Sequence, residues 1–412
     1  MASNSPRWRW LPSLLLAGLT LAWLLADQRG GGWPCAADYW EHLAVVNALA
    51  AHPAAPGHHL LAVDASHPFF SPFHLALAGV TNALGVPAET VLRLAGAFNF
   101  ILFAGAFLLA LTRLYPGGNA FFPTLALFFV LFAWPPGKLV WSGFLNVHAL
   151  RLTSPYPSLF AAALGFFCLA SNPADGRPGT VALILKAVLW ALMLLLHPTT
   201  FVIFAIADFC LLFARPAQPF STFPGRLARH ALPLAAAVPL AMAWPYYPVL
   251  GLLKPMTNAF NTDSAVFAAL PVAAVVAALS VAALLGLKRS RGLARSVVSC
   301  VVLAAGVYFA AVALGQYGQA RVLILIVLAV QLLAAYFASL LVASMSWKGR
   351  LCAGAAMAVI AAYACGAAGS YAREIAADCD KDLYRCPAQA AKGRPTALTP
   401  RKEALFAAAQ GF

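Results

Sequence analysis

Charge is scarce in this sequence. Only 10% of its 412 residues are charged and 62% are hydrophobic, whereas ordinary globular chains carry about 25% charged residues. A soluble domain built around one core is therefore excluded. The few charged residues bunch between long apolar runs, which also excludes a disordered or collagenous chain. The composition predicts an all-α protein, a polytopic bundle of transmembrane helices.

Cysteine is also too dilute to build the fold. Eight cysteines in 412 residues cannot form a disulfide framework, and most of them stand inside apolar runs as small hydrophobic residues. Cys379 and Cys386 bracket a polar stretch near the end of the chain. A disulfide between them would stabilise a small loop by about 2 to 3 kcal/mol. That bond requires an oxidising compartment.

Two further signatures are absent. No internal repeat is found, which argues against a secondary transporter, because transporters are commonly built from repeated halves. Neither an HExxH motif nor paired cysteines occur, which argues against a zinc site. We therefore expect no resident metal. The one metal grouping considered joins Asp38, Glu41 and His42 with His58 or His59.

Eleven apolar runs approach the roughly 20 residues that a helix needs to cross a bilayer. They lie at residues 10–26, 89–112, 120–134, 156–171, 180–196, 199–214, 231–250, 265–287, 296–315, 321–344 and 350–369. Short cytoplasmic loops retain Lys and Arg, and alternating spans from Arg7 and Arg9 place thirteen of the 27 basic residues on that side. The net charge of +14 is therefore attributed to topology, and no nucleic-acid partner is expected.

This topology requires residues 68–86 not to cross the membrane, because one more span would invert every later loop. Pro68, Pro72 and two histidines, His67 and His74, favour an interfacial or re-entrant helix there. A short twelfth span is the alternative. The first apolar run is expected to be an uncleaved anchor, because no clean cleavage site follows it.

The first outer loop, residues 27–88, holds four of the thirteen carboxylates and six of the nine histidines. Polar groups are costly near lipid, so this concentration is a candidate functional site. At its centre Asp38 opens a helical stretch that continues to about Ala51, with Glu41 and His42 one turn later. One interpretation is structural, with Asp38 and Glu41 capping the helix. The other is catalytic, with a carboxylate acting as general base at the outer face.

Later outer loops supply groups suited to an anionic substrate. Arg321 stands out, because a guanidinium in the least basic compartment matches a phosphate bidentately. Snorkelling of Arg321 to the lipid headgroups is the alternative, and Lys186, inside a span, is expected to snorkel to the cytoplasmic side. The candidates for binding the donor phosphate or substrate are Arg321, Arg151, Lys138, His148, Tyr156, His197, His67 and Gln319. Asp38 and Glu41 are the catalytic candidates.

The organisation of the chain resembles the GT-C superfamily of polytopic glycosyltransferases. The resemblance rests on a cytoplasmic start, a long first outer loop, an acidic residue at the head of an interfacial helix (Asp38 in AADYWEHLAVVNALAAHP), a second interfacial segment and a bundle of many spans. Asp38 matches the acidic position of the family. The second acid, Glu41, is not adjacent to it, unlike the paired acids of several members, so the identity of the base stays open.

The resemblance implies an enzyme that transfers a monosaccharide, of arabinofuranosyl or mannosyl type, from a polyprenyl-phosphate donor to a periplasmic acceptor with inversion. The acceptor would be a protein such as pilin, or a glycan or lipid. Residues 1–369 would form the membrane module and residues 370–412 a short periplasmic tail. The expected location is a bacterial inner membrane, with the site on its periplasmic face. A secondary transporter or a lipid flippase is the alternative function.

Overall fold

Helices account for every regular element in the described part of the chain. The computed structural model describes residues 10–29, 37–59, 67–115, 119–133, 142–172, 179–213, 223–249, 291–313 and 319–380. In chain order the elements are α1 (Leu11–Arg29), α2 (Ala37–Ala51), α3 (Pro72–Leu84), α4 (Ala88–Leu114), α5 (Phe122–Phe132), α6 (Val147–Thr153), α7 (Pro157–Ala170), α8 (Thr180–Leu196), α9 (Pro198–Cys210), η3 (Leu211–Phe213), α10 (Phe223–Met242), α12 (Arg291–Ala313), η7 (Gln319–Val322), α13 (Leu323–Ser344) and α14 (Trp347–Asp380). The expected all-α class is confirmed.

Three of the described helices are long and apolar enough to cross a membrane: α4, α13 and α14 as far as Ser370. The pair α6 and α7, bent by 119°, makes a fourth if it is one broken span. Other apolar helices, such as α5, α8 and α9, have 11 to 17 residues. At 1.5 Å per residue they are shorter than a hydrocarbon core of about 30 Å. The described residues thus support three or four spans, and the expected number of eleven is not shown. The expected run 265–287 lies outside them.

Proline and glycine set the helix boundaries around the first outer loop. α3 begins at Pro72, where a missing N–H costs no hydrogen bond. It ends at Gly85, whose φ of 61° is the left-handed conformation that glycine tolerates at a helix end. The expected interfacial segment is thus a separate helix of 13 residues, too short to span, and α4 starts anew at Ala88.

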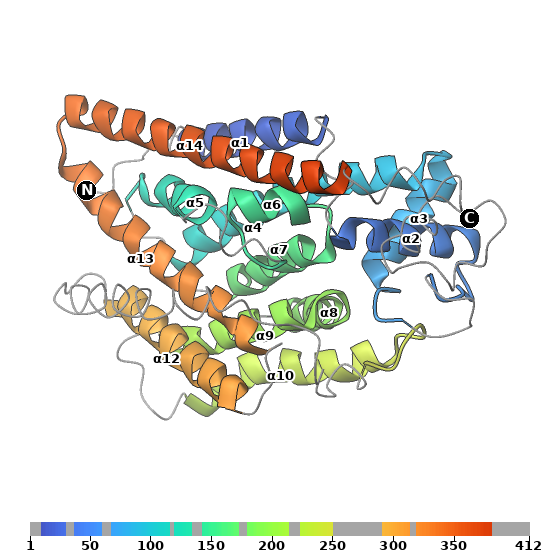
Figure 1. Ribbon diagram of the computed structural model, residues 1–412. Helices are drawn as coiled ribbons and strands as arrows, with labels where there is room; N and C mark the ends of the chain where they lie inside the picture. Colours follow the sequence, from blue (N-terminus) through green and yellow to red (C-terminus); the bar gives the residue numbers. More distant parts are fainter. Residues whose placement is uncertain are drawn as a thin grey trace.

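The helices form one bundle with distinct ends. α4 packs on α7, α8 on α10, and α5 on α13. α2 and α3 lie together at one end of the bundle, at the right of Figure 1, whereas the turn between α13 and α14 lies at the opposite end. α14 continues to Asp380, so the tail expected from residue 370 begins as helix. Cys386 lies outside the described residues.

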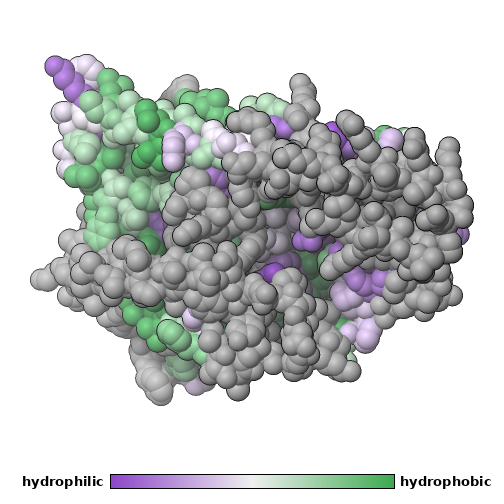
Figure 2. All heavy atoms as spheres, viewed as in Figure 1, coloured by the Kyte–Doolittle hydropathy of each residue, from purple (hydrophilic) through white to green (hydrophobic). Residues whose placement is uncertain are grey.

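The outer surface of the bundle is largely apolar. Large hydrophobic side chains are exposed on α1, α4, α8, α12 and α14, among them Leu15, Phe98, Ile184, Phe309 and Val359. Figure 2 shows hydrophobic surface next to a hydrophilic tip, at the left, where α13 meets α14 in Figure 1. Exposed apolar area of this extent marks a surface that meets lipid or another partner. Together with the candidate spans, it supports a helical membrane protein.

Candidate functional site

The two acids of the first outer loop occupy different environments. Asp38 is the second residue of α2, in the first turn of the helix, and is exposed. Because it lies inside the helix, it does not stand at the position of a capping residue. Glu41, one turn later, is only 6% exposed. Tyr39 and Trp40 between them are buried against Phe70 and fix α2 in place.

A chain of buried polar side chains joins α2 to α3. The Nδ1 atom of His42 lies 2.8 Å from Nε2 of His74, and Nδ1 of His74 lies 2.9 Å from the hydroxyl of Ser71. Burial lowers the pKa of His74 to about 3. Burial, followed by the charge of His74, also lowers the pKa of His42 well below its ordinary value. Both rings are therefore neutral at physiological pH, and they hold the two helices together by hydrogen bonds rather than by charge.

Three of the expected binding residues, Tyr156, Arg321 and His197, interact with His42, with Asp38 or with one another. The ring of Tyr156 lies 4.3 Å from the ring of His42, centroid to centroid. Burial lowers the pKa of Arg321, while the charge of Asp38 acts in the opposite direction. Burial, and then the charge of Arg321, lowers the pKa of His197 to about 3. Charge interactions therefore link Arg321 to Asp38 and to His197, and Tyr156 lies against His42.

His197 owes its position to a helix cap. Its Nδ1 atom accepts a hydrogen bond from the backbone N–H of Thr200 at 3.3 Å and lies 2.8 Å from the Thr200 hydroxyl. It thereby caps the first turn of α9. Because Nδ1 is the acceptor, the proton of the neutral ring belongs on Nε2, which lies 3.5 Å from the hydroxyl of Ser142.

Glu41 belongs to a second group of side chains. Its Oε1 atom lies 3.5 Å from Nε2 of the buried His59. The rings of His58 and His59 are stacked at 4.9 Å, and the ring of His67 meets His59 edge-on at 4.4 Å. Ligand atoms of the three histidines lie within 4.8 Å of one another, so they could hold a metal ion. This grouping differs from the one considered from the sequence, because it includes His67 whereas Asp38 and His42 take no part in it.

Other expected binding residues do not join Asp38. Arg151 is buried, forms an ion pair with Asp27 on α1 and donates a hydrogen bond to the carbonyl of Ala368 on α14. The expectation that it binds a donor phosphate is therefore wrong, because its guanidinium ties α6 to two other helices. His148 is buried one turn before Arg151 on the same helix. Lys138 lies outside the described residues, and of Gln319 the structure describes only the backbone, in η7.

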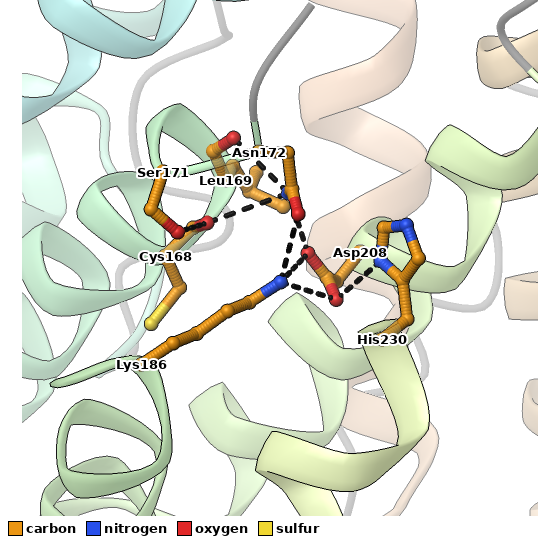
Figure 3. Close-up of polar contacts among 7 residues, drawn as sticks. All are labelled: Cys168, Leu169, Ser171, Asn172, Lys186, Asp208 and His230. Carbon is orange, nitrogen blue, oxygen red and sulfur yellow. Dashed lines mark hydrogen bonds and ion pairs between the residues drawn. The ribbon is translucent and has the colours of Figure 1, made fainter. Parts of the chain in front are cut away.

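A buried ionic cluster joins α8, α9 and α10. Lys186 donates to both carboxylate oxygens of Asp208, at 2.9 and 3.0 Å, and to the amide oxygen of Asn172 at 2.9 Å. Nδ1 of His230 lies 2.7 Å from the second oxygen of Asp208. Figure 3 shows these side chains converging on Asp208. The expectation that Lys186 snorkels to the cytoplasm is therefore wrong, because it is only 4% exposed and its ammonium faces a buried carboxylate.

Sequence reasoning missed the pairing of His42 with His74 and the whole cluster around Asp208. A signal existed for the first, because both histidines belong to the six that crowd the first outer loop. For the cluster around Asp208, the signal was that Lys186 and Asp208 lie inside neighbouring apolar runs, since a charge at membrane depth needs a partner.

Comparison with known proteins gives no relative for this chain. No protein-family model, no curated protein and no solved structure matches it.

Proposed function

We propose that the chain is a membrane glycosyltransferase of GT-C type and that Asp38 is its general base. The observation that carries this proposal is the contrast between the two acids. Asp38 is exposed, within electrostatic range of Arg321, whereas Glu41 is buried against His59. Only an exposed carboxylate can reach the hydroxyl of an incoming acceptor. The eleven-span bundle, the inner membrane and a periplasmic site belong to the same proposal.

The chemistry follows from the residues around Asp38. Its carboxylate takes the proton of the acceptor hydroxyl as that oxygen attacks the anomeric carbon of the sugar. The bond from that carbon to the lipid phosphate breaks, and the phosphate leaves with the electron pair. Arg321 would bind the leaving phosphate, because a guanidinium donates two parallel hydrogen bonds to such a group. His197 is neutral near pH 7 and contributes an Nε2–H donor rather than charge.

The test compares surface glycans and glycoproteins, by mass spectrometry, from cells with and without the gene. A sugar that is lost on deletion should return with the wild-type chain and with Glu89→Gln, which alters a partly buried acid on α4. It should not return with Asp38→Asn, provided that the variant is inserted at the wild-type level. Restoration by Asp38→Asn would reject Asp38 as the base, and an unchanged glycan profile on deletion would reject the proposed function.

The buried cluster around Asp208 favours a second candidate, an ion- or proton-coupled transporter. Ionisable residues inside membrane bundles commonly mark ion pathways. The purified chain, reconstituted in vesicles, would then take up a solute in response to a pH gradient, and Asp208→Asn would abolish uptake. Sugar transfer that survives Asp208→Asn, without any uptake by the wild-type chain, would favour the enzyme.

A further inference from the structure

We propose that Glu41, His58, His59 and His67 form a binding site for one divalent transition-metal ion of the zinc type. Ligand atoms of the three histidines lie within 4.8 Å of one another, and Glu41 Oε1 lies 3.5 Å from His59 Nε2. In a tetrahedral site with bonds of about 2.0 Å from zinc to its ligands, neighbouring ligand atoms are about 3.3 Å apart. Small side-chain movements would therefore complete the coordination.

His59 supplies a second, independent observation. Its side chain is 0% exposed, yet neither ring nitrogen makes a hydrogen bond with any residue that the structure describes. Buried polar atoms nearly always have a partner, so a nitrogen without one requires an explanation. A metal ion between His59 and Glu41 provides that partner, because a neutral imidazole nitrogen and a carboxylate oxygen are both ligands of zinc.

The donor set selects the class of metal. Three imidazole nitrogens and one carboxylate oxygen suit zinc and its neighbours in the first transition row. Magnesium and calcium prefer oxygen ligands throughout, so this site would discriminate against them. The ligands come from three places: α2 for Glu41, the segment after α2 for His58 and His59, and the segment before α3 for His67.

A bound ion would act on the position of α2. It would tie both flanking segments to Glu41, one helical turn from Asp38, and so fix the start of the helix that presents the exposed carboxylate. The ion itself would not touch the substrate, because Glu41 and His59 are buried. Binding of the metal is therefore independent of whether the chain transfers a sugar.

The experiment measures metal binding to the purified full-length chain in detergent. The protein is stripped with a chelator, titrated with zinc sulfate and analysed for bound metal by mass spectrometry. The wild-type chain should bind about one zinc ion per chain, and replacing a ligand should weaken binding by about tenfold or more. His59→Ala removes the buried ligand. His58→Ala removes a half-buried ligand. It keeps the test valid if His59→Ala does not fold, as judged by failure to elute as a monodisperse species.

His52→Ala is the matched control, because His52 lies in the same segment but is exposed and outside the group. It should bind zinc as the wild-type chain does. Glu41→Gln should change the visible absorption of the cobalt-loaded protein, since it replaces a charged ligand. The proposal is overturned if the wild-type chain binds no zinc, or if His58→Ala and His59→Ala retain full binding. The cluster would then be an ion pair between Glu41 and His59 alone.

Discussion

At the scale of single residues, position in the fold decides what each titratable group can do. Asp38 and Glu41 are three residues apart, yet one is exposed and the other buried. Arg321 and Arg151 were both expected to bind phosphate, yet the structure pairs Arg151 with Asp27. Of these two arginines, Arg321 is the one on which the charge of Asp38 acts. Residue types alone identify the candidates for a site, whereas burial decides which of them can act there.

His197 should make stability depend on pH. Its pKa is about 3 in the folded chain and ordinarily about 6.5. Between these values the unfolded chain binds the proton and the folded chain does not, so this stability is present above pH 6.5 and is lost as the pH falls toward 3. His197→Asn should keep the helix cap without titrating. Thermal unfolding in detergent at several pH values should show a smaller loss of stability on acidification for the variant than for the wild-type chain. Equal pH profiles of the two chains would contradict this prediction.

Lys186 should be essential to the stability of the buried cluster. Lys186→Met leaves the Asp208 carboxylate buried without its ammonium partner, which costs about 3 to 5 kcal/mol. Denaturant unfolding should show that loss, and Lys186→Met combined with Asp208→Leu should recover part of it. Lys348→Met, at an exposed position, is the control and should stay within about 0.5 kcal/mol of the wild-type chain. An equal loss of stability in Lys348→Met would refute the assignment of this stability to the pair of Lys186 and Asp208.

At the scale of elements, close helix contacts depend on small residues. A Cβ atom added at Gly165 on α7 would overlap the ring of Phe204 on α9. The ring itself meets Phe166 edge-on at 4.8 Å. The aromatic side chain therefore occupies the space that glycine leaves, and α9 lies against α7 at that point.

Gly165→Ala should destabilise the bundle by about 1 to 3 kcal/mol, because overpacking displaces Phe204. Gly105→Ala, on α4, is the matched control, since its added Cβ meets no atom within 4 Å. That control should be neutral or stabilising by up to about 1 kcal/mol, because alanine favours helix. Thermal melts of the two variants in the same detergent would check the difference. Similar melting temperatures for both would show that α7 and α9 can move apart freely.

Sequence periodicity located some elements accurately. The run 180–196 coincides with α8, and the runs 89–112 and 321–344 lie within two residues of α4 and α13. Long apolar stretches bounded by polar residues leave little choice of boundary. The run 231–250 was less accurate, because α10 begins at Phe223 and includes the charged Arg226 and Arg229. The run 156–171 lies within one residue of α7, whereas the short helix α6, which precedes the bend, was not expected.

The candidate site could be predicted only in part. Asp38, Tyr156, His197 and Arg321 were all named from sequence, and in the structure the charge of Asp38 acts on Arg321 and the charge of Arg321 acts on His197. The partners of Arg151 and Lys186 could not be foreseen, because Asp27 lies 124 residues away and Asp208 lies in the next apolar helix. Long-range pairing depends on how the helices pack, which a single sequence does not encode in its local pattern.

At the scale of the whole molecule, the two ends of the bundle should lie on opposite sides of the membrane. Ala54 follows α2, and Ser346 lies in the turn between α13 and α14; both are exposed. In a cysteine-free background, a membrane-impermeant thiol reagent added to intact spheroplasts should label Ala54→Cys but not Ser346→Cys. Inside-out vesicles should give the reverse pattern. Labelling of both positions from one side would contradict the expected topology and remove Asp38 from the outer face.

The short helices α8 and α9 have a consequence for the surrounding lipid. α8 exposes Val181, Ile184 and Leu185, an apolar face suited to contact with lipid tails, yet its 17 residues rise only about 26 Å. Hydrophobic mismatch of this size is relieved by local thinning of the leaflet. Headgroups beside α8 would then sit deeper than in the bulk bilayer, nearer to His197 at the end of that helix. A lipid-linked substrate would need to rise less far out of the membrane to react.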